Sequence, residues 1–70
     1  MATISSSDNL FATACVHGTE FFRFAGSGIS DFSEIVSKIR NHPAAVPGMV
    51  TITVRNSSRG WSQSRSVYLA

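Results

Sequence analysis

The residues whose types best suit contact with a polyanion lie near the C-terminal end of the sequence. They are three arginines and the only tryptophan of the chain, Arg55, Arg59, Trp61 and Arg65. Arginine pairs with phosphate oxygens and an aromatic ring stacks on an unpaired base, so a sheet face that carries both is typical of a nucleic-acid contact. These four residues are the candidate nucleic-acid contact.

The alternation of a strand argues against a single patch of these residues. Side chains two positions apart lie on the same face, so Trp61 and Arg65 share the face of Val67, whereas Arg55 faces the other way. Trp61 can instead close one end of the core, and the glycine-and-aromatic motif of RNA-binding sheets is absent. We prefer a solvated hairpin with a structural tryptophan and keep nucleic-acid binding as the alternative.

Cys15 and His17 are two positions apart, so their side chains point the same way if a strand continues that far. A metal site would need further ligands, and a Cys–His nucleophile pair would need an orienting residue and a substrate cleft. We interpret the pair as a core thiol and a turn histidine. The sequence therefore predicts no catalytic residue and no metal site.

Gly26, Ser27 and Gly28 precede a helical segment, where free N–H groups attract anions. The nucleotide-binding fingerprint is incomplete, because there is no GxGxxG pattern, no following lysine and no later strand–helix unit. We interpret this stretch as a connector. No cofactor and no enzymatic activity are predicted.

The composition is that of a small globular domain. The chain has 70 residues, of which 43% are hydrophobic and 14% are charged, enough for one core and too few for two. The formal net charge of +2 neither requires nor excludes an anionic partner. The single cysteine excludes an internal disulfide framework and suits a reducing compartment.

The chain carries no recognisable targeting signal. Its first residues lack a charged region followed by an apolar run, and nowhere do the ~18 consecutive apolar residues of a membrane span occur. We expect a cytoplasmic protein without membrane contact. Residues 1–8 are serine-rich and are expected to form a disordered tail, and residues 9–70 are expected to form one domain.

The segment Ile29–His42 is the one clear helix. Apolar residues recur there at i, i+3, i+4 and i+7, which is the spacing of one helical face: Phe32, Ile35, Val36 and Ile39. These apolar side chains must be buried, so we expect the helix to pack against one face of a sheet.

The ends of the helix have their own signals. Asp31 and Glu34 have the spacing of a capping box, with Ser30 as the alternative N-cap. Pro43 disfavours helical geometry at His42 and ends the helix.

Two apolar runs, Leu10–Val16 and Thr19–Ala25, are joined by His17-Gly18, which predicts a tight β-hairpin. Both faces of this hairpin are apolar, and each phenylalanine left in water forgoes roughly 1.5–3 kcal/mol of burial. One helix covers one face. A second copy of the chain is the simplest cover for the other.

Pairing Val16 with Thr19 in an unbroken ladder puts Phe11, Phe22 and Phe24 on one face and Phe21 on the other. Because either face could be the uncovered one, the candidate self-association residues include all four phenylalanines: Phe11, Phe21, Phe22 and Phe24.

The C-terminal part contains the strongest strand signal, Met49–Val54, and a returning strand, Trp61–Leu69. Placing Ile52 opposite Val67 gives one apolar face and one polar face of threonine, serine, arginine and tyrosine side chains. This hairpin has the pattern of a sheet with one solvated side.

Together these elements predict a β-β-α-β-β domain of the α+β class. A four-stranded, mostly antiparallel sheet carries one helix on one face, and the strand order is left open. The expected function is that of a small non-enzymatic interaction module that acts through protein–protein contact as a homo-oligomer, with itself or another protein as partner. The alternative is nucleic-acid binding through the basic C-terminal hairpin.

Overall fold

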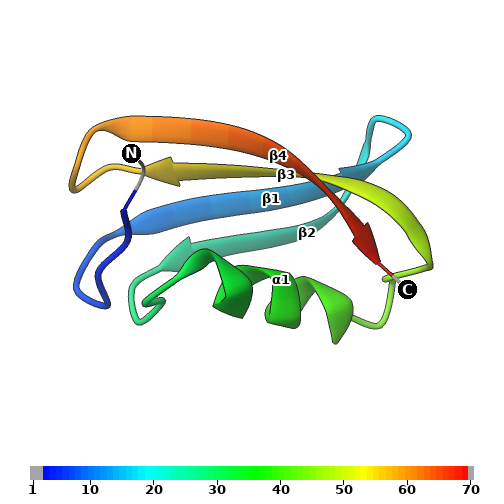
Figure 1. Ribbon diagram of the computed structural model, residues 1–70, viewed down its shortest axis with the longest axis horizontal. Helices are drawn as coiled ribbons and strands as arrows, with labels where there is room; N and C mark the ends of the chain where they lie inside the picture. The colour runs from blue at the N-terminus through cyan, green and yellow to red at the C-terminus, as the bar shows by residue number, and fades with distance from the viewer. Residues whose placement is uncertain (1–2, 70) are drawn as a thin grey trace.

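Two β-hairpins and one helix build the structure, as Figure 1 shows. The computed structural model describes residues 3–69, and residues 1, 2 and 70 lie outside that range. The elements are β1 (Leu10–Val16), β2 (Thr19–Gly26), α1 (Phe32–Arg40), β3 (Gly48–Asn56) and β4 (Trp61–Leu69). The predicted α+β class and the β-β-α-β-β order are confirmed.

The four strands form one antiparallel sheet in the order β2-β1-β3-β4. The antiparallel pairing of β1 with β3 joins the two hairpins, from Leu10 opposite Asn56 to Cys15 opposite Thr51. Strands β2 and β4 are therefore the two edges. The helix lies over one face only and leaves the other face without a covering element within residues 3–69 (Figure 1).

The helix is shorter than the segment predicted for it. It begins after Asp31, whose side chain accepts a hydrogen bond from the N–H of Glu34 at 3.2 Å, and it ends at the C-cap Asn41. The predicted cap at Asp31 is confirmed. Ile29 precedes the helix but is only 2% exposed, so its apolar side chain belongs to the core without belonging to the helix.

The core lies between α1 and the two central strands. Ile35 and Ile39 are buried, as the apolar stripe predicts. Ala12 and Ala14 of β1 have no exposed surface, and their small side chains leave room for the isoleucines of the helix. The buried apolar residues are Leu10, Ala12, Ala14, Ile29, Ile35, Ile39, Val50, Ile52, Val54 and Leu69.

The first hairpin forms as predicted at its turn but not along its length. Val16 does pair with Thr19, and then the register shifts so that Cys15 lies opposite Glu20 and Ala14 opposite Phe22. The extra residue, Phe21, forms a β-bulge. The prediction of an unbroken ladder was wrong, because a bulge sends the residues beyond it to the other face.

The second hairpin has the predicted faces in a different register. Val50, rather than Ile52, lies opposite Val67, and Ile52 lies opposite Arg65. The shift is two residues, and because the side-chain period of a strand is also two, every side chain keeps its face. Val50, Ile52 and Val54 are buried and the intervening threonines are exposed.

The segment Thr3–Asp8, predicted as part of a disordered tail, makes several contacts with the rest of the chain. Ser6 accepts a hydrogen bond from the N–H of Gly28 at 2.8 Å, and Ile4 is partly buried against the core. Asp8 is 5% exposed. Within residues 3–69, no helix has the length and apolar character needed to cross a membrane.

Candidate functional site

The sheet face opposite α1 has no covering element in the described part of the chain, and we call it the open face. Alternation along each strand puts threonine, serine and arginine side chains on it, together with a few large apolar ones. Phe11 is 41% exposed, Met49 59% and Tyr68 63%. This surface is the candidate functional site.

One end of the open face combines an aromatic ring with two arginines. Phe11 of β1 lies directly opposite Arg55 of β3, and the guanidinium carbon of Arg23 lies 5.8 Å from the centroid of the Phe11 ring. Arg23 also donates a hydrogen bond to the carboxylate of Glu20 at 3.0 Å. Positive charge therefore lies on both sides of the Phe11 ring. The charge of Arg23 is partly neutralised by Glu20.

The other end of the open face carries Met49 and Tyr68, which are direct cross-strand partners. Hydroxyl groups fill the space between the two ends. Thr53 and Ser64, also partners, have their hydroxyl oxygens 3.1 Å apart. The face therefore has a polar centre and an apolar or aromatic group at each end.

The structure separates the four residues of the candidate nucleic-acid contact. Arg55 lies on the open face, whereas the guanidinium carbon of Arg65 lies 4.2 Å above the ring centroid of Phe32, on the helix side. The expectation from alternation, that Arg55 and Arg65 face opposite ways, is confirmed. These two arginines form no common patch.

Arg59 and Trp61 both contact the N-terminal segment. The Nε atom of Arg59 donates a hydrogen bond to the Asp8 carboxylate at 2.6 Å, and the indole N–H of Trp61 donates to the backbone oxygen of Thr3 at 3.2 Å. Trp61 is half-buried and packs against the core. Both residues are thus engaged within the chain.

The bulge also divides the four candidate self-association residues. Phe21 and Phe22 both lie against His42, with ring centroids 6.0 Å and 5.8 Å from the imidazole, so they belong to the helix side. Phe24 is half-buried there too, opposite Ala12. Phe11 is the member that lies on the open face.

The smaller motifs take structural positions. His17 is exposed in the hairpin turn with a φ of 51°, as predicted, whereas Cys15 is half-buried in β1 outside the hydrophobic core, so the prediction of a core thiol was wrong. The N–H of Gly28 is already donated to Ser6. Among residues 3–69 no three His, Cys, Asp or Glu side chains lie close enough together to hold a metal ion.

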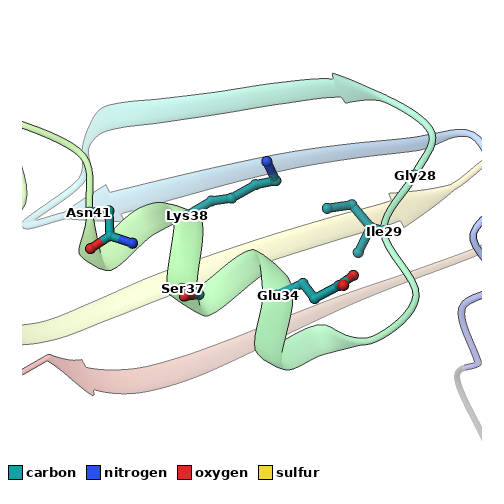
Figure 2. Close-up of a pocket in the computed structure, with 6 residues that line it drawn as sticks. All are labelled: Gly28, Ile29, Glu34, Ser37, Lys38 and Asn41. Atoms are coloured by element: carbon teal, nitrogen blue, oxygen red, sulfur yellow. The ribbon is translucent and has the colours of Figure 1, made fainter.

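A shallow hollow runs beside α1, lined by Gly28, Ile29, Glu34, Ser37, Lys38 and Asn41 (Figure 2). Figure 2 shows Glu34 pointing back toward the loop before the helix, where its carboxylate accepts a hydrogen bond from the N–H of Ser30. Lys38 extends toward β2, and its Nζ lies 5.5 Å from the ring centroid of Phe24. Both charged groups already have intramolecular contacts.

A buried polar cluster was not anticipated from the sequence. The Asp8 carboxylate accepts hydrogen bonds from Asn56 Nδ2 at 2.9 Å, Arg59 Nε at 2.6 Å and the Ser5 N–H at 3.0 Å. The hydrogen bonds from Asn56 and then Arg59 lower the pKa of Asp8 below its ordinary value of 3.8. No local signal marks this cluster, because Asp8 follows a serine run and its side-chain partners Asn56 and Arg59 lie 48 and 51 positions away in the sequence.

The chain was also compared with known proteins. Neither the protein-family models nor the curated proteins nor the solved structures gave a match.

Proposed function

We propose that this protein is a small non-enzymatic interaction module that acts through protein–protein contact and forms a homo-oligomer. The observation that carries the proposal is the open face, on which Phe11, Met49 and Tyr68 remain exposed in a single chain. Aromatic residues, methionine and arginine are enriched at protein interfaces, and lysine and acidic residues are depleted. Glu20, paired with Arg23, is the one acidic side chain near this face in the described residues.

Sedimentation equilibrium of the full chain over a range of concentrations tests the oligomer. A single chain has a mass of 7.5 kDa, so we expect a weight-average mass that rises above this value with concentration. A mass of 7.5 kDa at every concentration would exclude the homo-oligomer. The same measurement at raised ionic strength should change little, because apolar contacts are not screened by salt.

The variant Phe11→Asp asks which surface the oligomer uses. Phe11 is exposed, so the substitution puts a charge on the open face without removing a buried core residue. Loss of association would locate the contact on the open face. Retained association would show that the oligomer forms elsewhere, and the open face would then be the contact surface for a different protein.

Nucleic-acid binding is the second candidate function, and one observation on the open face favours it. The Phe11 ring lies between the guanidinium of Arg23 and the cross-strand neighbour Arg55, which resembles the stacking platforms of single-strand-binding sheets. The site differs from the one predicted from the sequence, since only Arg55 is common to both.

Fluorescence anisotropy with a labelled single-stranded oligothymidylate tests this candidate. Binding should weaken with salt at a log–log slope of about −0.7 for each phosphate neutralised. Arg55→Ala should weaken binding more than the matched variant Arg40→Ala, because Arg40 ends α1 on the other side of the sheet. A slope near zero, or equal effects of the two variants, would exclude it.

A further inference from the structure

Strand β4 is an unprotected edge of the sheet. It pairs with β3 along its whole length, from Trp61 opposite Asn56 to Leu69 opposite Gly48, with no register shift. No strand within residues 3–69 lies on its other side. Half of its backbone N–H and C=O groups therefore face outward, which is a template for another strand.

The two edges of the sheet differ in how they are protected. Strand β2 carries the bulge at Phe21 and the Glu20–Arg23 ion pair, and bulges and charges are devices that block edge pairing. Strand β4 contains no glycine, no proline and no bulge, and Arg65 is its only charged residue. Of the two edge strands, β4 is therefore the one that can pair with another strand.

The helix side of β4 is incompletely covered. The nine residues of α1 span about 14 Å, and Ile35 and Ile39 are buried over the central strands. Trp61 and Val67 of β4 are consequently only half-buried, and Arg65 is exposed. A second strand beside β4 would remove further apolar surface of Trp61 and Val67 from water.

The sequence of β4 is complementary to itself in an antiparallel register centred on Ser64. With Ser64 opposite Ser64 of a second copy, Trp61 meets Val67 and Gln63 meets Arg65, each pair occurring twice. The register centred on Arg65 sets two like charges face to face. The register centred on Ser66 places Arg65 opposite Val67.

We propose that two copies of this chain join their β4 strands antiparallel about a twofold axis at Ser64, which makes one continuous eight-stranded sheet. This inference rests on the proposed homo-oligomer but places its contact at the β4 edge rather than on the open face, so Phe11→Asp should leave this dimer intact. Backbone hydrogen bonds between the two edges provide the affinity, and the Trp61–Val67 and Gln63–Arg65 pairs fix the register. The open faces of both copies remain accessible on one side of the joined sheet.

Cysteine crosslinking in a Cys15→Ser background tests the register. Ser62, Ser64 and Ser66 are all exposed on the open face. At the twofold axis the two Cα atoms of residue 64 would lie about 4.5–5.5 Å apart, which is within the Cα–Cα range that a disulfide spans. Ser64→Cys should therefore give an oxidised, disulfide-linked dimer.

Single variants at the flanking serines are the matched controls. In this register Ser62 faces Ser66 of the second copy, so two copies of residue 62 are separated by about 13 Å along the strand and cannot be bridged. Ser62→Cys and Ser66→Cys should each stay unlinked, and the Ser62→Cys/Ser66→Cys double variant should crosslink. Dimers of either single variant in the same yield as Ser64→Cys would overturn the proposal.

A charge series at Gln63 gives an independent measurement on folded protein. Gln63→Arg sets a like charge opposite Arg65 in two places and should raise the dimer dissociation constant roughly 2- to 30-fold. Gln63→Glu should lower it, and circular dichroism checks that both variants fold. Equal dissociation constants for the two variants would overturn the β4 interface.

The two proposals fail in different ways. A wild-type chain that stays at 7.5 kDa removes the homo-oligomer and this interface together. A wild-type dimer that shows no crosslink at residue 64 and no response at Gln63 removes the β4 interface alone.

Discussion

The guanidinium of Arg59 donates to the Asp8 carboxylate at 2.6 Å, although 51 positions of sequence separate the two residues. Asn56, at the end of β3, donates to the same carboxylate, and its own amide oxygen accepts from the backbone N–H of Arg59. One carboxylate thus connects the N-terminal segment to the β3–β4 turn. Asn56 has no exposed surface, so this polar network is part of the folded interior.

The first prediction concerns the acid stability that Asp8 confers. Hydrogen bonds from Asn56 and Arg59 hold the pKa of Asp8 below 3.8, so its contribution to the free energy of unfolding is complete above that value. It is lost as the pH falls through the lower pKa of the folded state. Urea denaturation between about pH 7 and pH 2 should therefore show a shallower acid loss for Asp8→Asn, with lower stability at neutral pH.

Asp31 is a second carboxylate that should contribute to the acid dependence of stability. Hydrogen bonds from the Ser33 hydroxyl and then from the Glu34 N–H also lower the pKa of Asp31, so Asp31→Asn should remove a separate share of the acid dependence. The double variant should be less pH-dependent than either single variant. An acid profile of Asp8→Asn that parallels the wild type would contradict the role of this carboxylate.

The second prediction concerns the cover that the helix gives the sheet. Ile39 has no exposed surface, and Ile39→Ala should lower the free energy of unfolding by about 2–5 kcal/mol because it leaves a cavity above the central strands. Val46, which is 53% exposed, provides the control, and Val46→Ala should change stability by less than about 0.5 kcal/mol. Chemical denaturation of both variants gives the comparison; similar losses would argue against this core.

The third prediction concerns the contact between Arg65 and Phe32. A guanidinium 4.2 Å above an aromatic centroid gives a cation–π attraction of about 0.5–1 kcal/mol at an exposed site. A double-mutant cycle with Arg65→Ala and Phe32→Leu should return a coupling energy of that size. The cycle is measured on dilute protein, where association does not contribute, and a coupling energy of zero would show that the two side chains do not interact in solution.

The fourth prediction concerns the hairpin turn. His17 and Gly18 both have positive φ angles, 51° and 78°, which is the geometry of a two-residue hairpin turn that favours Asn-Gly. His17→Asn should therefore raise the free energy of unfolding, whereas Gly18→Ala should lower it by about 1–2 kcal/mol. Thermal melts rank the variants. A His17→Asn protein less stable than the wild type would mean that the histidine makes a contact beyond its backbone conformation.

The sequence predicted the elements well because their signals are local. The 3.6-residue recurrence of Phe32, Ile35, Val36 and Ile39 requires only one segment, and Gly18 marks its turn without reference to the rest of the chain. The site was predicted less well. Alternation did separate Arg55 from Arg65, but the flanking of Phe11 by Arg23 and Arg55 depends on which strands are neighbours.

By itself the sequence determined the strand–strand–helix–strand–strand order, the apolar stripe of the helix and the polar outer face of the second hairpin, since each follows from a periodicity within one segment. Only the tertiary structure decided the pairing of β1 with β3, the bulge at Phe21 and the attachment of Asp8 to Arg59. These depend on packing between distant segments. The side chains of Phe22 and Phe24 are sheltered on the helix side only if the ladder slips by one residue, and no local pattern encodes that requirement.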